Sequence, residues 1–167
     1  MILYPSAEAD SIDDIPFEEL YKKGYRGVIF DIDNTLVPHG APADDHAIDF
    51  FRKLHGIGFD TCLISNNKEE RVMPFAKAVN SKAVWDAHKP SKRNYIYACE
   101  TMHVTVETAL FVGDQLFTDV WGANKAGIKS ILVKPIHPKE EIQIVLKRYL
   151  ERPILYFYRK KKRDQLI

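Results

Sequence analysis

Five short apolar runs alternate along the chain with segments of helical pattern, and this alternation constrains the fold more than any other feature. The runs cover residues 27–32, 59–65, 83–87, 108–113 and 129–133. Each has the length and the β-branched or aromatic content of a buried strand. Strands that are separated by helices pair in parallel, with helices on both faces of the sheet. The sequence therefore predicts a three-layer α/β fold around a central parallel sheet.

The segments between the runs carry helix start and stop signals. Asp44 or Asp45 can cap a helix that runs to residue 54, with Gly56 as its stop. Further helices are expected over residues 92–102, 116–126 and 139–150.

Length and composition fit one globular domain. The 167 residues are 46% apolar and 28% charged, with no run long enough to span a bilayer and no signal peptide. Cys62 and Cys99 form no metal-binding pattern. No linker divides the chain, so we expect one domain over residues 1–152 and an apolar and basic tail over residues 153–167. These features favour a cytoplasmic protein in a reducing compartment.

Polar side chains follow four of the five predicted strands. They are Asp31 and Asp33 after the first, Ser65, Asn66 and Asn67 after the second, Lys89 after the third, and Asp114 and Asp119 after the fourth. In parallel sheets, ligands bind outside the carboxyl ends of the strands. We therefore expect these residues to converge on one polar site.

The residue types at these strand ends indicate phosphoryl chemistry. Carboxylates that crowd one edge repel each other unless a cation neutralises them, and a hard divalent ion such as Mg²⁺ suits oxygen ligands. A lysine and a serine hydroxyl add donors for an anion beside the metal. The chain has no glycine-rich phosphate loop. A carboxylate is therefore the expected phosphoryl acceptor, through an aspartyl-phosphate intermediate.

The order of these residues resembles a known family. The strings D-x-D-N-T-L-V at Asp31, S-N-N at Ser65, K-P at Lys89 and G-D-Q-x-x-T-D at Gly113 resemble the four motifs of the haloacid dehalogenase (HAD) superfamily, subclass IIIA. They look like those of the YqeG-type phosphatases, a group related to the mitochondrial phosphatidylglycerophosphate phosphatases. The resemblance implies a Rossmann-like fold and runs from about Tyr4 to Val133.

The resemblance also implies a role for each motif residue. Asp31 is then the nucleophile, and Asp33 protonates the leaving group and later activates water. Ser65 and the backbone amide of Asn66 bind the phosphate, while Lys89 neutralises charge. The metal ligands implied by the resemblance are Asp31, Asp33 through its backbone carbonyl, Asp114 and Asp119, the last of which supports the metal through water or orients Lys89.

The spacing between the motifs leaves no room for a cap domain. Ser65 follows Asp33 by 32 residues, and Lys89 follows Ser65 by 24. One helix and one strand account for the residues of each interval. An uncapped site is open to solvent unless a substrate or partner covers it. Capless relatives act on large substrates or form oligomers that build a lid, so an oligomer is one expectation.

The end of the chain is strongly basic. Residues 147–167 contain eight basic and two acidic residues, for a net charge of +6, while the rest of the chain carries −5. The cluster Arg159–Arg163 follows an apolar, aromatic segment and suits the inner face of an anionic membrane. Contact with RNA and a solvated terminus are the alternatives, and the same segment could form a final strand or a core-packing arm.

The sequence thus predicts an Mg²⁺-dependent phosphatase of a phosphate monoester, with a phospholipid head group such as phosphatidylglycerophosphate as one candidate substrate. A small soluble or nucleic-acid phosphomonoester is an alternative, and a catalytically idle scaffold is another. A receiver-type signalling domain is disfavoured, because it carries its acceptor aspartate after the third strand. The six histidines show no metal-ligand spacing and are expected to be structural or exposed, with His39 nearest the site.

Overall fold

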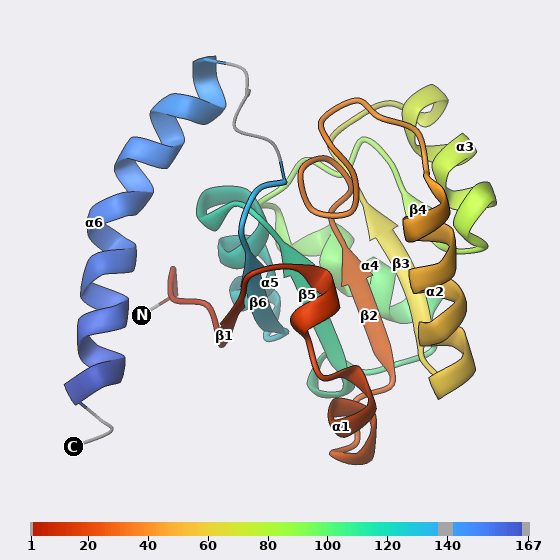
Figure 1. Ribbon diagram of the computed structural model, residues 1–167, viewed down its shortest axis with the longest axis horizontal. Helices are drawn as coiled ribbons and strands as arrows, with labels where there is room; N and C mark the ends of the chain where they lie inside the picture. Colours follow the sequence, from red (N-terminus) through yellow and green to blue (C-terminus); the bar gives the residue numbers. More distant parts are fainter. Residues whose placement is uncertain (1, 137–141, 165–167) are drawn as a thin grey trace.

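The computed structural model describes residues 2–136 and 142–164. Six parallel strands form one sheet in the order β1-β6-β5-β2-β3-β4 (Figure 1). Their bounds are β1 (Ala7–Ala9), β2 (Gly27–Phe30), β3 (Asp60–Ile64), β4 (Lys82–Val84), β5 (Ala109–Gly113) and β6 (Lys129–Val133). The predicted parallel α/β sheet is confirmed.

Helices cover both faces of the sheet. They are α1 (Phe17–Lys22), α2 (Asp45–Ile57), α3 (Glu69–Val79), α4 (Lys92–Thr101), α5 (Trp121–Ala126) and α6 (Ile142–Asp164), with short turns η1 (Ile12–Asp14), η2 (Val106–Thr108) and η3 (Leu116–Val120). Side chains of β2 alternate between two cores: Val28 and Phe30 pack with α1, α2 and α3, and Ile29 packs with α4 and α5. This alternation produces the three predicted layers.

The pairing of the central strands brings the motif residues to one edge. Phe30 of β2 lies opposite Leu63 of β3 and Val112 of β5. Asp31, Ser65 and Asp114 directly follow these three strands, so they lie together at the carboxyl end of the sheet. Of the described residues, only a loop and α2 lie between β2 and β3, and only α3 with its flanking loops lies between β3 and β4, so neither interval contains an inserted cap domain.

The predicted elements are present, but several bounds differ. The Asp44 side chain accepts a hydrogen bond from the Ala47 amide at 2.8 Å and caps α2, which ends at Gly58 and not at Gly56. Gly58 adopts a φ of 121°, which only glycine tolerates readily, whereas Gly56 remains in the helix. The segment over residues 116–126 divides into a π-helical turn, η3, and the short helix α5.

The N-terminal segment contains two elements that the sequence did not predict. β1 pairs in parallel with β6 at the edge of the sheet, and α1 follows it. Phe17 of α1 packs edge-on against Phe50 and Phe59, so this segment covers one face of the core.

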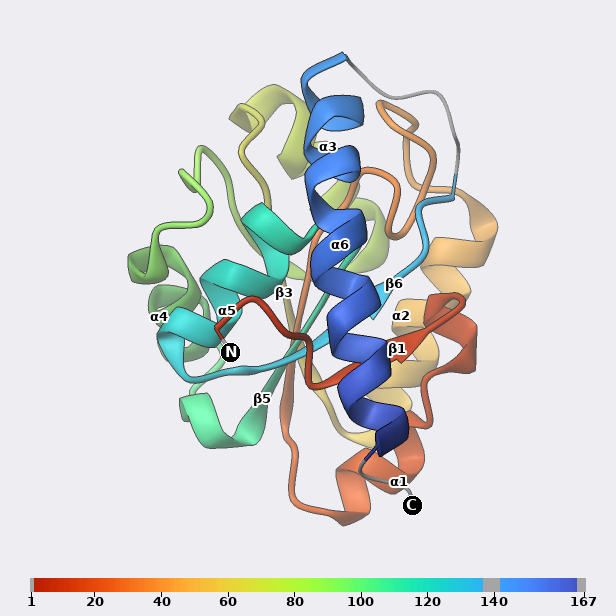
Figure 2. The ribbon, with the colours of Figure 1, turned by 90° about the vertical axis from the view of Figure 1, so that its left-hand side faces the viewer.

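Helix α6 is much longer than predicted. Its described part runs to Asp164 through Pro153, so the alternative of a final strand is wrong; residues 139–141 of the predicted helix lie outside the described residues. Figure 2 shows α6 lying across the β1 and β6 edge of the sheet. Ile154 and Leu155 pack on a small cluster with Leu132 of β6. Within the described residues no helix combines the length and hydropathy needed to cross a bilayer.

Candidate active site

Lys89 lies at the centre of the site, held between two carboxylates. Its Nζ donates to Asp31 Oδ1 and to Asp119 Oδ1, each at 2.7 Å. All three side chains are at least nine-tenths buried. The sheet brings together an ammonium from the loop after β4 and carboxylates that follow β2 and β5.

Thr35 links the first motif to the last. Its Oγ1 lies 3.2 Å from Asp31 Oδ2 and 3.1 Å from Asp114 Oδ1. A hydroxyl has one hydrogen, so Thr35 donates to one of these carboxylates at a time. The two carboxylates therefore lie on either side of one small side chain.

Asp119 is fully engaged by the protein. Besides Lys89, it accepts hydrogen bonds from the backbone amides of Asp114 and Gln115 on Oδ2, both at 3.1 Å. No side chain longer than hydrogen fits at Gly113, because a Cβ there would lie 2.5 Å from that oxygen. Asp119 thus fixes the loop after β5 and positions Lys89.

The carboxylates of the site are electrostatically crowded. Burial, followed by the charge of Asp119, raises the pKa of Asp31 well above its usual range and that of Asp114 to about 6. Burial alone would lower the pKa of Lys89, but Asp119 and Asp31 outweigh it and raise the pKa, so the ammonium stays charged. The site contains more negative charge than one lysine neutralises.

The donor set fits a hard divalent cation. Asp31, Asp114 and Asp119 each place one carboxylate oxygen so that all three lie within 4.8 Å of one another. Oxygen ligands of this kind suit Mg²⁺, and a cation would relieve the crowding that raises the carboxyl pKa values. Both oxygens of Asp119 accept hydrogen bonds from Lys89 or backbone amides, whereas Asp31 Oδ2 and Asp114 Oδ1 share the single hydrogen of Thr35. Asp31 and Asp114 are therefore the better direct ligands.

Residues of the second motif form hydrogen bonds to the loop that carries Lys89 and within their own loop. Asn66 Oδ1 accepts the Lys89 backbone amide at 2.7 Å, which fixes the loop that carries the lysine. Ser65 is buried, and its Oγ accepts the Asn67 amide at 3.1 Å. Its hydroxyl hydrogen is therefore available to another acceptor.

The Asp33 carboxylate accepts hydrogen bonds from three donors. Its Oδ1 accepts the Gly40 amide at 2.7 Å and Arg71 Nη2 at 2.9 Å, and its Oδ2 accepts Asn67 Nδ2 at 2.8 Å. Arg71, in the first turn of α3 and four residues after Asn67, is a site residue that was not predicted from the sequence. An arginine in the first turns of a helix usually faces solvent, so its spacing gave only a weak signal.

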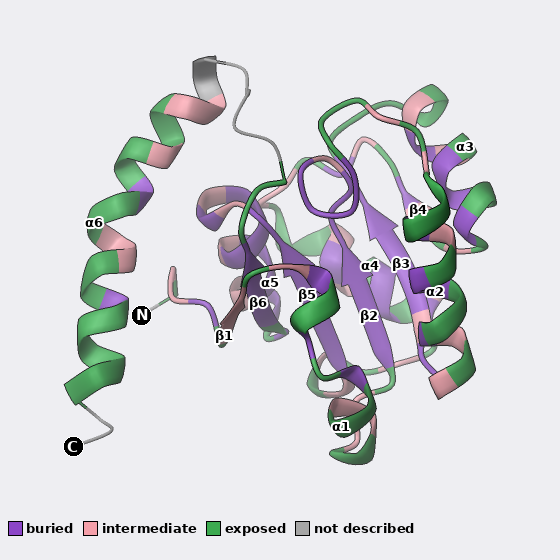
Figure 3. Ribbon diagram, viewed as in Figure 1, coloured by how far each residue is buried: buried purple, intermediate pink, exposed green. Residues whose placement is uncertain are grey.

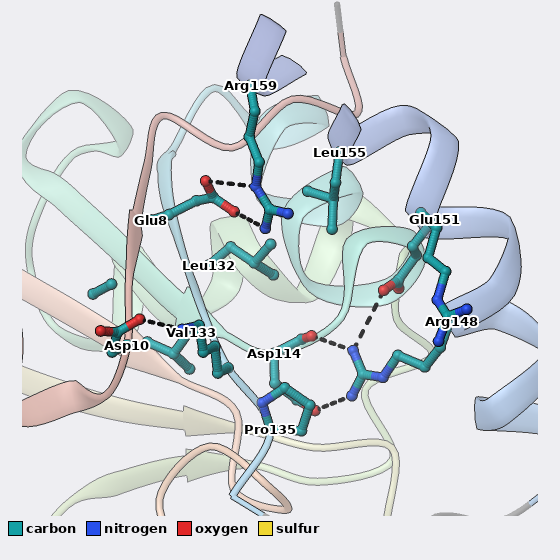
Figure 4. Close-up of a pocket in the computed structure, with 13 residues that line it drawn as sticks. Glu8, Asp10, Asp114, Leu132, Val133, Pro135, Arg148, Glu151, Leu155 and Arg159 are labelled. Carbon is teal, nitrogen blue, oxygen red and sulfur yellow. Dashed lines mark hydrogen bonds and ion pairs between the residues drawn. The ribbon is translucent and has the colours of Figure 1, made fainter. Parts of the chain in front are cut away.

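Arg148 is a site residue that was not predicted, because it was counted only among the basic residues at the end of the chain. Its Nη2 lies 2.5 Å from Asp114 Oδ2, and its Nη1 donates to the Asp114 carbonyl oxygen (Figure 4). Glu151, one turn later, lies 3.4 Å from Arg148 Nη1 and accepts the Leu116 amide at 2.8 Å. These contacts border a cavity of about 700 Å³ between α6 and the β1 and β6 edge.

Replacing Arg148 with alanine is expected to destabilise the metal-free protein by about 3 kcal/mol, because it leaves the buried Asp114 and Glu151 carboxylates without their cation. Urea unfolding in EDTA measures the effect. The matched control is Arg93→Ala, at an exposed position on α4. Equal midpoints for the two variants would contradict a structural role of the Arg148 contacts.

Neither cysteine provides a thiolate nucleophile, and two of the described histidines have partners outside the site. Burial raises the pKa of Cys62 to about 12 and that of Cys99 to about 11, which keeps both as neutral thiols. His55 lies 2.9 Å from Thr61 Oγ1, away from the motif residues, and His46 contacts Asp13 at 2.8 Å. His39 is exposed on the loop that also carries Gly40.

The chain is similar to known hydrolases of one family. The family described as HAD-hydrolase-like matches residues 87–141. The "Probable phosphatase YqeG" of Bacillus subtilis (strain 168) is 32% identical over 158 residues, which cover 94% of this chain and 92% of the relative.

Two solved structures share the fold at low sequence identity. A protein from Listeria monocytogenes serotype 4b is 17% identical, with a TM-score of 0.55 over 70% of this chain and 84% of that one. A predicted phosphoglycolate phosphatase from Haemophilus somnus 129PT is 16% identical, with a TM-score of 0.52 over 65% and 85% of the two chains. At this identity the likeness shows the fold alone.

Proposed function

We propose that this chain, which belongs to the HAD superfamily as a phosphatase of the YqeG type, hydrolyses a phosphate monoester. In this proposal the reaction uses Mg²⁺ and passes through a covalent intermediate on Asp31. The observation that carries the proposal is the buried ion pair of Asp31 with Lys89, at 2.7 Å, beside Asp114. A carboxylate nucleophile needs neighbouring positive charge to approach a phosphate dianion, and Lys89 supplies it.

The residues divide the reaction into two displacements. An Asp31 oxygen forms a bond to phosphorus while the bond from phosphorus to the leaving oxygen breaks, and Asp33 gives that oxygen a proton. Asp33 then takes a proton from water, which attacks phosphorus and frees Asp31 with release of inorganic phosphate. Ser65, the Asn66 backbone amide and Lys89 hold the phosphate oxygens. Bound to Asp31, Asp114 and the Asp33 carbonyl, with Asp119 in support, Mg²⁺ would supply further charge neutralisation.

Asp33→Asn is expected to trap the intermediate. With p-nitrophenyl phosphate, whose leaving group needs no proton, the first displacement proceeds, but the second lacks its base. Steady-state turnover should fall by about 10²- to 10⁴-fold, with an initial burst of nitrophenolate. Intact mass spectrometry of the quenched enzyme should show one added phosphoryl group.

The matched control is Asp86→Asn, a half-buried aspartate at the same end of the sheet, which should turn over normally. Linear product formation by Asp33→Asn with no phosphoryl group on the protein would contradict the covalent route.

Metal binding should depend on pH in a defined direction. Burial and Asp119 raise the pKa of Asp114 to about 6 from its ordinary value of 3.8, so between these two pH values the metal-free folded protein holds a proton that the unfolded chain has lost. Its stability therefore falls as pH rises through this window, and Mg²⁺ must displace those protons to bind. The rise in melting temperature caused by Mg²⁺ should be larger at about pH 7.5 than at about pH 5. Equal shifts at both pH values would contradict this ligand set.

For the substrate, we propose a phospholipid head group such as that of phosphatidylglycerophosphate, acted on at the inner face of the membrane by a cytoplasmic enzyme. The support is the open site, without a cap in the described residues, and the basic segment Arg159–Arg163. A soluble or nucleic-acid phosphomonoester and a catalytically idle scaffold are the alternatives. Helix α6 continues through residue 152 without a break, so the division of the chain at this residue is not a structural boundary. In this proposal it separates the catalytic part of the chain from the part that contacts the membrane.

The test is Mg²⁺-dependent phosphate release from phosphatidylglycerophosphate in micelles, soluble sugar and nucleotide phosphates, and 3′-phosphorylated oligonucleotides. Asp31→Asn serves as the blank. Release from the lipid alone supports the proposal, and preference for soluble esters or oligonucleotides replaces the lipid while keeping the phosphatase. No release from any substrate, with Mg²⁺ bound, favours the scaffold.

A further inference from the structure

Helix α6 contacts the protein through both polar and apolar side chains, Ile154 and Leu155 among them, and leaves its most exposed large apolar residues on the opposite side. Toward the body, Arg148 contacts Asp114, Glu151 accepts the Leu116 amide, and Arg159 pairs with Glu8 at 2.7 Å. We call the opposite side the outer face. Its large apolar residues are each 58–63% exposed: Leu146, Tyr149, Leu150, Tyr156 and Phe157. Figure 3 shows that most of α6 is exposed.

The outer face is continuous along the helix. Leu146, Leu150, Pro153 and Phe157 follow one another at spacings of three or four residues, which places them in one stripe. The rings of Tyr156 and Phe157 pack edge-on at 5.5 Å, and the Arg152 guanidinium lies over the Tyr149 ring at 4.7 Å. Scattered exposed apolar residues are ordinary, but a contiguous stripe marks a surface that another phase or molecule covers.

The positive charge of α6 indicates which kind of partner can bind its outer face. Residues 142–164 contain eight basic and two acidic residues, a net charge of +6. The cluster Lys160–Arg163 is exposed and directly continues the apolar stripe. A second copy of the chain would bring two such helices together and repel. A nucleic acid would meet the cations but leave the aliphatic side chains in water.

We propose that the outer face of α6 docks the protein on an anionic lipid surface, with the helix lying in the plane of the interface. Leu146, Leu150 and Phe157 would enter the boundary between head groups and acyl chains, and the basic cluster would contact anionic head groups. The side chains of Tyr149 and Tyr156 have the amphipathic character that suits this depth.

Docking in this way places the site close to the lipid. On the inner side of the same helix, Arg148 binds Asp114, which is one of the proposed metal ligands. The docked surface and this end of the site therefore lie on opposite sides of one helix, whose diameter is about 10 Å. The inference rests on the proposed function only in that a lipid substrate gives the docking a purpose. Vesicle binding needs no turnover, so the two proposals can fail separately.

The test is co-sedimentation of the full chain with vesicles of phosphatidylglycerol and phosphatidylcholine, compared with vesicles of phosphatidylcholine alone. The wild type should bind the anionic vesicles, and the double variant Leu150→Glu/Phe157→Glu should bind at least about tenfold more weakly. The matched control is Tyr97→Glu on α4, at a residue that is 53% exposed, and it should bind like the wild type. It adds the same charge as the single variant Leu150→Glu, which should bind more weakly. Lys160→Glu/Lys161→Glu should weaken binding and reduce its salt dependence.

Four results would overturn the proposal. They are equal binding of both vesicle types, unchanged binding of the Leu150→Glu/Phe157→Glu variant, tighter binding to oligonucleotides than to vesicles, and a dimer that this variant alone dissociates. Because the substituted positions are exposed, circular dichroism should show an intact fold. Asp31→Asn should still bind vesicles, and the α6 variants should still hydrolyse a soluble ester, which separates docking from catalysis.

Discussion

Asp31→Asn is expected to reduce phosphate release by about 10³-fold or more, to the level of the blank, without unfolding the protein. The amide cannot attack phosphorus, so no phosphoryl group should appear on the variant. Lys89 keeps its second partner, Asp119 at 2.7 Å, so the buried ammonium remains paired.

The variant should also be at least as stable as the wild type without metal. Burial and the charge of Asp119 raise the pKa of Asp31, which means that its ionised form is disfavoured in the folded state. A neutral amide of the same shape removes this repulsion. We therefore expect a melting temperature in EDTA equal to or above that of the wild type, together with a smaller rise on addition of Mg²⁺.

Kinetics and thermal unfolding of the same preparations check both expectations. Asp86→Asn, at a half-buried aspartate at the same end of the sheet, should change neither quantity. Substantial residual activity in Asp31→Asn would assign the nucleophile elsewhere. A large loss of stability would mean that the carboxylate is a structural partner of Lys89 first.

The convergence of the motif residues could be predicted because it depends only on strand direction. Asp31, Ser65 and Asp114 each follow an apolar run, and parallel strands bring their carboxyl ends to one edge. The hydrogen bonds from Lys89 and Thr35 could not be predicted in this way, because they depend on side-chain geometry across elements far apart in the chain.

The elements missed by the sequence analysis have weak local signals. β1 has three residues, fewer than an alternating pattern needs, and it gains its hydrogen bonds from β6. The last helix was expected to end at residue 150, and Pro153 follows that end by three residues; proline inside a helical pattern usually predicts a break or kink. Pro153 lies on the outer face of α6, and the helix continues beyond it. The contact of Arg148 with Asp114 depends on the packing of that whole helix.

Lys89→Met is expected to have the largest effect on stability. It leaves Asp31, Asp114 and Asp119 buried within 4.8 Å of one another with no ammonium between them. Removing one partner of a buried pair costs about 3–5 kcal/mol, so urea unfolding in EDTA at neutral pH should show a loss of that size. Activity should be lost as well, because the nucleophile and the phosphate lose their shared cation.

The pH dependence and a matched control separate this effect from a simple cavity. Below about pH 5 Asp114, whose pKa is raised to about 6 by burial and Asp119, takes up a proton, so the loss caused by Lys89→Met should shrink, and Mg²⁺ at neutral pH should restore part of the stability. Lys68→Met removes an ion pair with Asp86 of similar length, 3.1 Å, but the Lys68 side chain is 73% exposed. That control should lose no more than about 1 kcal/mol. A loss for Lys89→Met that is the same at both pH values and insensitive to Mg²⁺ would mean that the methylene packing of Lys89, and not its charge, stabilises the site.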